Sequence, residues 1–231
     1  MLRAILCELE GVLVQTTSQR RSAMSRAIAS LGGSLPDDWR SQVTEPPIVP
    51  GDAEHALRAA GLEADQTNID LAGLAASNFF CENVSINGVI LAPGAISLMR
   101  EAAAQVKLAL VTRARRREVE AILAHTPFAD AFSFVIAEED ASRRKPHPDP
   151  YMKALDRLRL PPDGTGVRDV LALEHGAPGI ASAVAAGVRC VAVGPFEQAA
   201  GVAPVGTLPS LDGTSVELLA RYLEYDPEVA V

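Results

Sequence analysis

The sequence is poor in the residues that mark several large functional classes. Only three cysteines occur in 231 residues, Cys7, Cys81 and Cys190, and they lie far apart. An odd number of scattered cysteines indicates neither a disulfide framework nor a zinc ribbon. We therefore expect a reducing, cytoplasmic location for this chain.

Basic residues are also scarce. The 21 Lys and Arg stand against 29 Asp and Glu, which gives a net charge of −8. Nucleic-acid binding depends on a concentrated basic surface, and the one dense basic run, from Arg113 to Arg117, is short. No stretch of about 18 uncharged apolar residues occurs either, so no membrane span is predicted. We expect neither a nucleic-acid nor a membrane partner.

Hydrophobic residues, by contrast, are plentiful. They make up 48% of the chain, although only 4% of the residues are aromatic. This content excludes intrinsic disorder, and 231 residues are enough for one domain that carries a smaller insertion. The chain is predicted to fold around a substantial core.

Short apolar runs of strand length recur along the chain, separated by segments with the spacing of amphipathic helices. Nearly continuous apolar runs are typical of parallel strands that are buried on both faces of a sheet. The alternation with helices predicts an α/β fold, a doubly wound parallel Rossmann-like sheet. The five runs are residues 2–7, 108–112, 132–137, 170–173 and 188–193.

One segment departs from this alternation. Between the first two runs, residues such as Met24, Ala27 and Ile28 keep helical spacing. We predict a small helical cap domain of residues 16–87, inserted into a core domain of residues 1–15 and 88–231. Trp39 is expected to pack inside this cap.

Polar and charged residues follow the predicted strands. Ligands of open α/β folds bind at the carboxyl ends of the strands, so side chains at these positions are candidates for a common site. A carboxylate pair, a hydroxyl, a lysine and a further acid would meet there. The candidates are Glu8, Glu10, Thr112, Arg113, Lys145, Glu174 and His175.

Two longer motifs carry a family resemblance. The stretch from Lys145 to Tyr151 reads KPHPDPY, and Glu174 is followed by Gly179-Ile180 and then by Ala185-Ala-Gly187. These motifs resemble the haloacid dehalogenase-like (HAD) superfamily, in its branch of phosphoglycolate phosphatases and β-phosphoglucomutase-like enzymes. The resemblance covers nearly the whole chain and is weakest in the predicted cap.

The resemblance implies a role for each matching residue. Glu8 stands at the position of the family's nucleophile and Glu10 at that of its acid and base. Thr112 and Lys145 match the residues that hold the phosphoryl oxygens, and Arg113 is placed to add to anion binding. The implied metal ligands are Glu8, Glu10, Glu174 and His175. Mg²⁺ is the expected ion, while a histidine ligand would favour Mn²⁺ or Zn²⁺.

The chain also departs from the family pattern. Where the family has DxDGT, it has Glu8, Glu10 and Val12, and His175 replaces a metal-binding aspartate. Each glutamate extends its carboxylate by roughly 1.3 Å, and an error of about 1 Å in a reacting geometry can cost around a hundredfold in rate.

Two functions therefore stay open. One is a metal-dependent phosphatase or phosphomutase that acts on a small phosphorylated metabolite. The other is a catalytically inactive relative that serves as a binding or regulatory protein. The sequence leaves open whether the protein is a monomer or a homodimer.

The arginine run after Thr112 has a simpler interpretation beyond Arg113. We expect the remaining arginines to be solvated and to pair with acids one turn away, such as Glu118 or Glu120.

Overall fold

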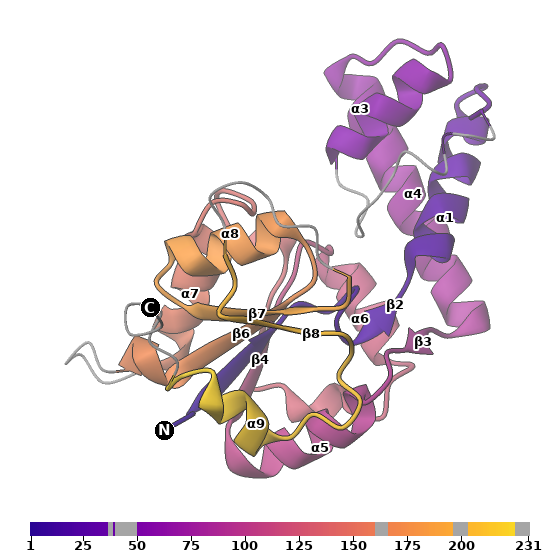
Figure 1. The fold of residues 1–231 in the computed structure, drawn as a ribbon. Coiled ribbons are helices and arrows are strands. Elements are labelled where there is room, and N and C mark those ends of the chain that lie inside the picture. The colour runs from indigo at the N-terminus through magenta and orange to yellow at the C-terminus, as the bar shows by residue number, and fades with distance from the viewer. Residues whose placement is uncertain (37–38, 40–49, 160–165, 196–202, 225–231) are drawn as a thin grey trace. The chain divides into compact units, whose positions relative to one another are not determined.

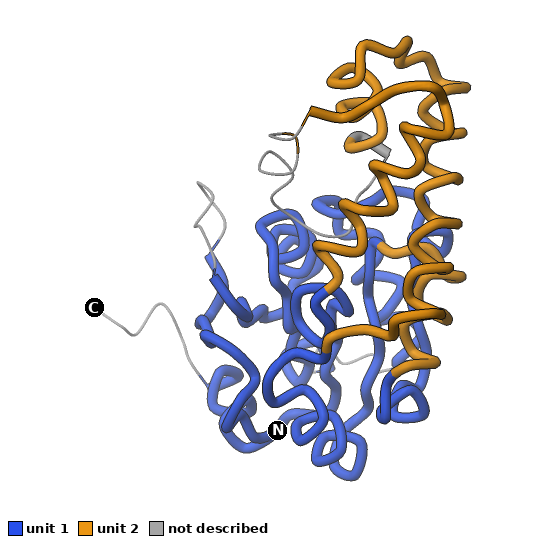
Figure 2. The backbone as a smooth tube through the Cα atoms, turned by 90° about the vertical axis from the view of Figure 1, so that its right-hand side faces the viewer, with its two compact units in different colours: residues 1–15, 91–113, 126–231 blue, residues 16–90, 114–125 orange. Residues whose placement is uncertain are grey.

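The chain forms two compact units in a computed structural model, which describes residues 1–36, 39, 50–159, 166–195 and 203–224. The first unit comprises Met1–Gln15, Leu91–Arg113 and Thr126–Val231, and the second comprises Thr16–Ile90 and Ala114–His125 (Figure 2). The domain boundaries suggested by the sequence stay a prediction.

A six-stranded parallel sheet forms the centre of the first unit. Its strand order is β5-β4-β1-β6-β7-β8, and every neighbouring pair runs parallel. The predicted α/β, doubly wound Rossmann-like fold is thus confirmed. The strands are β1 (Ala4–Cys7), β4 (Lys107–Val111), β5 (Phe134–Ile136), β6 (Val170–Glu174), β7 (Arg189–Val193) and β8 (Gly206–Leu208).

Helices cover both faces of this sheet. Helices α7 (Asp149–Leu158) and α8 (Ala177–Ala185) lie on one face, and α5 (Ala95–Gln105) and α9 (Val216–Arg221) lie on the other (Figure 1). Leu6 of β1 and Ile180 of α8 belong to one continuous buried cluster. Since successive residues of a strand point to opposite faces, this double cover explains why the strands are continuously apolar.

The last strand, β8, does not follow from the sequence. It consists of Gly206, Thr207 and Leu208, and Thr207 is exposed. A three-residue edge strand that contains a glycine has no apolar run to reveal it. Its hydrogen bonding to β7 arises from tertiary structure.

The second unit is helical. Its helices are α1 (Thr17–Ser30), α3 (Pro50–Ala59), α4 (Gln66–Asn87) and α6 (Arg116–Leu123). Trp39 is buried in a cluster with Met24 and Ile28 of α1, which confirms the expected packing role.

A buried ion pair joins two helices of the second unit. The Arg20 guanidinium lies 2.9 Å from Glu118 Oε2, with both side chains almost fully buried, and 3.6 Å from the centre of the Phe80 ring. Glu118, expected as a partner for the arginine run, thus forms its ion pair with Arg20, far away in the sequence. The partner of Glu118 comes from a distant helix, so the neighbouring residues in the sequence could not predict this ion pair.

Short elements complete the described structure. The strands β2 (Val14–Gln15) and β3 (Ile90–Leu91) form a two-stranded sheet. The 3₁₀ helices are Ala129–Ala131, Glu138–Asp140 and Gly166–Asp169.

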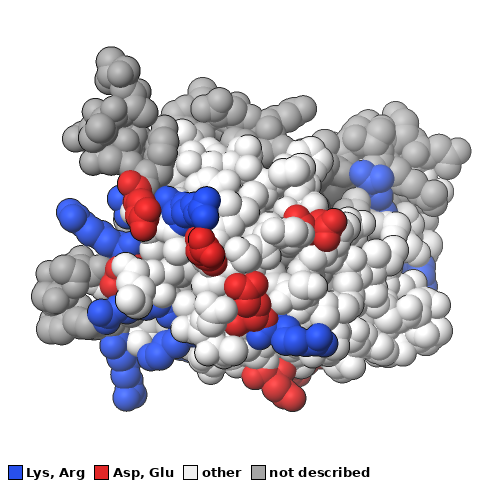
Figure 3. All heavy atoms as spheres, turned by 60° about the horizontal axis from the view of Figure 1, so that its bottom comes forward, with Lys and Arg blue, Asp and Glu red and all other residues white. Residues whose placement is uncertain are grey.

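Acidic and basic side chains lie interspersed among uncharged ones on the face drawn in Figure 3. Such mixing is typical of a solvated surface. Among the described helices, none combines the length and the apolar character needed to cross a bilayer.

Candidate active site

The carboxyl ends of three central strands bring the predicted site residues to one level of the sheet. Cys7 of β1 lies opposite Leu110 of β4 and Leu173 of β6. The next residues along the three strands, Glu8, Val111 and Glu174, must then lie side by side. Parallel register explains how distant segments supply a single site.

Lys145 enters this level from the loop after β5. Its Nζ donates hydrogen bonds to Glu8 Oε2 at 2.9 Å, to the Val111 carbonyl at 2.7 Å and to Glu174 Oε1 at 2.5 Å. A lysine ammonium has three N–H donors. All three are used, and the side chain is almost fully buried.

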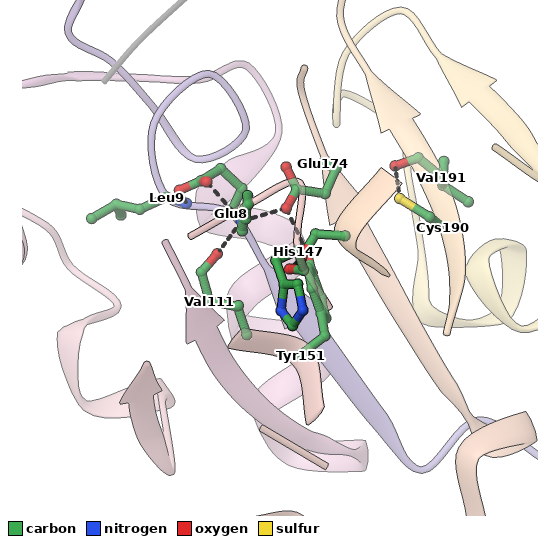
Figure 4. Close-up of polar contacts among 10 residues, drawn as sticks. Glu8, Leu9, Val111, His147, Tyr151, Glu174, Cys190 and Val191 are labelled. Atoms are coloured by element: carbon green, nitrogen blue, oxygen red, sulfur yellow. Dashed lines mark hydrogen bonds and ion pairs between the residues drawn. The ribbon is translucent and has the colours of Figure 1, made fainter. Parts of the chain in front are cut away.

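Both oxygens of the Glu8 carboxylate accept hydrogen bonds. Oε2 takes the bond from Lys145, and Oε1 accepts from the Leu9 backbone N–H at 2.8 Å. Figure 4 shows Glu8, Val111 and Glu174 gathered around the hydrogen bonds of this cluster. These bonds hold the Glu8 carboxylate in a fixed orientation.

Glu174 is fixed from two further sides. The Tyr151 hydroxyl donates to Oε1 at 2.6 Å (Figure 4). At Gly179, in the first turn of α8, a Cβ would lie only 2.0 Å from Glu174 Oε2. Glycine is thus required at residue 179 for the Glu174 carboxylate to lie where it does.

The charges of this cluster balance in part. Burial would lower the pKa of Lys145, but the carboxylates of Glu174 and Glu8 outweigh it, and the Lys145 pKa is raised. Burial, together with the charge of Glu8, raises the pKa of Glu174 in spite of Lys145. The site thus contains its own cation between two carboxyl groups.

The other two predicted metal ligands, His175 and Glu10, do not accept the hydrogen bonds of Lys145. His175 Nδ1 is 2.9 Å from the Val193 carbonyl oxygen, and its imidazole covers Gly11, where a Cβ would be 2.5 Å away. Glu10 is fully buried, and its backbone bridges to Val14 in the turn after β1.

This arrangement does not fit a divalent ion as it stands. Lys145 already bridges Glu8 and Glu174, and no group of three or more His, Cys, Asp or Glu in the described ranges could hold a metal. The metal role of Glu8, Glu10, Glu174 and His175 stays a prediction.

A pocket opens beside the cluster within the first unit. Two alanines and a proline contribute to its wall, and its polar lining consists of Thr112, Arg113, Glu138, Arg144 and Lys145. Thr112 is buried, and Arg113 is half-buried. The three predicted phosphate-binding residues, Thr112, Arg113 and Lys145, therefore share one pocket.

Sequence reasoning gave no role to Tyr151, Glu138 or Arg144. Tyr151 ends the KPHPDPY motif, and its place in that motif was the available signal. Glu138 and Arg144 belong to no motif, and only the fold shows that they line this pocket.

Comparison with known proteins agrees with this fold. The chain matches the family model of the haloacid dehalogenase-like hydrolases over residues 72–193, and it belongs to that family. Its similarity extends to the branch of phosphoglycolate phosphatases and β-phosphoglucomutase-like enzymes, which confirms the resemblance seen in the sequence.

Particular relatives span most of the chain. Protein CbbY of Rhodobacter capsulatus is 30% identical over 82% of this chain and 84% of its own. Phosphoglycolate phosphatase of Pectobacterium atrosepticum is 26% identical over 82% of this chain and 79% of its own. The crystal structure of CbbY from Rhodobacter sphaeroides in complex with phosphate has a TM-score of 0.78 and 26% identity, and covers 95% of this chain and all of that one.

Proposed function

We propose that this protein binds a small phosphorylated metabolite at the carboxyl edge of the sheet and hydrolyses its phosphate ester or transfers the phosphoryl group. The observation that carries the proposal is the convergence of Glu8, Lys145 and Glu174 next to the pocket that Thr112 lines. The phosphate bound to a CbbY relative supports a phosphate ligand at this fold.

In this proposal Glu8 is the nucleophile. One of its carboxylate oxygens attacks phosphorus, an oxygen–phosphorus bond to the leaving group breaks, and a carboxyl phosphate forms on Glu8. Glu10 gives a proton to the departing oxygen, and it then takes one from the water, or from the acceptor hydroxyl, that removes the phosphoryl group. Hydrogen bonds from Thr112 and Lys145 stabilise the phosphoryl oxygens.

Lys145 has to rearrange for this role. Its three donors are engaged with Glu8, Val111 and Glu174. A phosphoryl oxygen therefore replaces one of these acceptors when it binds. The neutral Val111 carbonyl is the acceptor whose loss removes no ion pair.

A specific observation favours a second candidate, a binding protein without turnover. Both Glu8 oxygens are held by hydrogen bonds, and His175 contacts the Val193 carbonyl where the family has a metal-binding aspartate. With each carboxylate about 1.3 Å further from its backbone, attack on phosphorus could be lost while phosphate binding persists.

Phosphate release separates the two candidates. The assay uses p-nitrophenyl phosphate and a panel of sugar phosphates with Mg²⁺, Mn²⁺ or Zn²⁺, since HAD phosphatases generally use Mg²⁺. For an enzyme, we expect turnover by the natural chain and a loss of at least about a hundredfold in Glu8→Ala. An inactive natural chain together with activity in Glu8→Asp would instead establish the binding protein.

The same proposal includes the domain organisation of the chain. We assign residues 1–15 and 88–231 to a core domain with the chemistry, and residues 16–87 to a cap that selects the substrate. The cytoplasmic location and the choice between monomer and homodimer stay predictions from the sequence.

A further inference from the structure

The two carboxylates that a divalent ion would need at this site are engaged by groups of the protein itself. Glu8 accepts from Lys145 with one oxygen and from a backbone N–H with the other. Glu174 Oε1 accepts from Lys145 and from the Tyr151 hydroxyl. Glu174 Oε2 packs against Gly179, where a Cβ would lie only 2.0 Å away. Mg²⁺ requires oxygen ligands at about 2.0 to 2.1 Å in near-octahedral geometry, and this packing works against such a shell.

The Lys145 ammonium lies between the two carboxylates. Its Nζ is 2.9 Å from Glu8 Oε2 and 2.5 Å from Glu174 Oε1, and none of the three side chains is more than 5% exposed. It thus supplies positive charge where a bridging divalent ion would supply it. A second cation beside it would be repelled, and burial makes that repulsion stronger than in water.

His175 stands where the family has a metal-binding aspartate, and it contributes no carboxylate. Its Nδ1 is 2.9 Å from the Val193 carbonyl oxygen, which can only accept, so Nδ1 carries the proton. Two glycines confine the ring, since an added Cβ would lie 2.5 Å from it at Gly11 and 3.2 Å from it at Gly194. The substitution therefore removes one negative charge from the edge of the sheet at which Glu8 lies.

Lys145 can bind a phosphoryl group without losing either ion pair. Of its three acceptors, only the Val111 carbonyl is neutral. When a phosphoryl oxygen replaces this carbonyl, the ammonium contacts the phosphoryl group, Glu8 and Glu174 together. Arg113 lines the adjoining pocket and adds a second cation for the same phosphoryl group.

We propose that Lys145 takes the place of a divalent cation at this site, so that the protein binds its phosphorylated ligand without a metal. The inference rests on the proposed function and adds its cofactor requirement. Two consequences can be measured. Added Mg²⁺ leaves phosphate binding unchanged, and removal of the Lys145 ammonium opens the position between Glu8 and Glu174 to a divalent ion.

Calorimetric titration of the natural chain with inorganic phosphate tests the first consequence without turnover. One titration contains EDTA, and the other contains excess Mg²⁺. We expect the two dissociation constants to agree within about threefold. A greater tightening by Mg²⁺ overturns the inference and leaves the proposed function standing. Absence of phosphate binding in both titrations overturns the proposed function, and the inference with it.

Thermal unfolding of Lys145→Met with and without Mn²⁺ tests the second consequence. The variant leaves Glu8 and Glu174 without their cation, so Mn²⁺ should bind between them and raise the melting temperature by about 3 °C or more. The natural chain and Lys153→Met, which changes a surface lysine paired with Asp149, should shift by less than about 1 °C.

Two outcomes of the unfolding experiment overturn the inference. One is an equal shift in all three proteins, because Mn²⁺ would then bind where Lys145 has no influence. The other is a folded Lys145→Met that Mn²⁺ does not stabilise. The phosphate titrations need no variant, so they decide the question even where Lys145→Met does not fold.

Discussion

At the scale of single residues, Lys145 connects segments that are far apart in the sequence. Its ammonium contacts the turn after β1, the end of β4 and the end of β6. Buried charges are tolerated in proteins only when they are paired and hydrogen-bonded. The stability of this edge of the sheet should therefore depend on Lys145.

Replacing Lys145 with methionine tests this dependence. Lys145→Met keeps much of the side chain's volume but leaves Glu8 and Glu174 buried without their cation. We expect the free energy of unfolding in urea to fall by about 3 to 5 kcal/mol. The control is Lys153→Met, which removes a long surface ion pair with Asp149 and should cost less than about 1 kcal/mol. Similar losses in both variants would contradict the account.

Gly179 provides a second test at this scale. In Gly179→Ala, the new methyl group would occupy the place of the Glu174 carboxylate, so Glu174 must leave Lys145 and Tyr151. We expect a loss of about 1 to 3 kcal/mol in unfolding free energy. Gly73→Ala is the matched helical control, since its Cβ would meet a single atom at 3.4 Å, and it should stabilise by about 0.5 to 1 kcal/mol. Stabilisation in both variants would show that Glu174 does not need this space.

At the scale of elements, the buried pair of Arg20 and Glu118 connects α1 to α6 inside the second unit. Burial alone would raise the pKa of Glu118, but the Arg20 guanidinium outweighs it, and the pKa is lowered. A carboxyl group whose pKa is depressed by folding stabilises the protein above its unfolded pKa. That stabilisation is lost as the pH falls through the folded pKa.

The lowered pKa of Glu118 predicts how the stability of Glu118→Gln, relative to the natural chain, changes with pH. At neutral pH we expect the variant to lose about 3 kcal/mol of unfolding free energy, because Arg20 stays buried without its partner. As the pH falls through the lowered pKa of folded Glu118, the difference from the natural chain should shrink, since the carboxyl group then becomes protonated in the folded state as it already is in the unfolded state. Urea unfolding at several pH values measures this.

A matched control is Glu54→Gln, which breaks an exposed pair with Arg58 in α3. It should change the unfolding free energy by no more than about 0.5 kcal/mol at any pH. A difference for Glu118→Gln that stays constant down to low pH would contradict the assignment of the pKa shift to this ion pair.

How far the elements follow from the sequence depends on their burial. The five apolar runs became β1, β4, β5, β6 and β7 because helices cover both faces of the sheet. The edge strand β8 and the burial of Glu118 depend on tertiary contacts, for which the local sequence holds no signal.

At the scale of the whole molecule, topology explains why the site could be foreseen in part. A parallel sheet puts all its carboxyl ends at one edge, so Glu8, Lys145 and Glu174 were expected to meet, and they do. Their hydrogen bonding was not foreseeable. The saturation of Lys145 depends on strand register and on the Val111 carbonyl, and the position of His175 depends on Gly11 and Gly194.

The proposed mechanism requires that Glu8 receives the phosphoryl group of the substrate. The most direct measurement is acid quenching of the protein during turnover of p-nitrophenyl phosphate, followed by tryptic digestion and mass spectrometry. We expect one added phosphoryl group on the peptide of residues 4–20, located at Glu8 and missing from Glu8→Ala. An unmodified peptide, or a phosphoryl group on another residue, would contradict it.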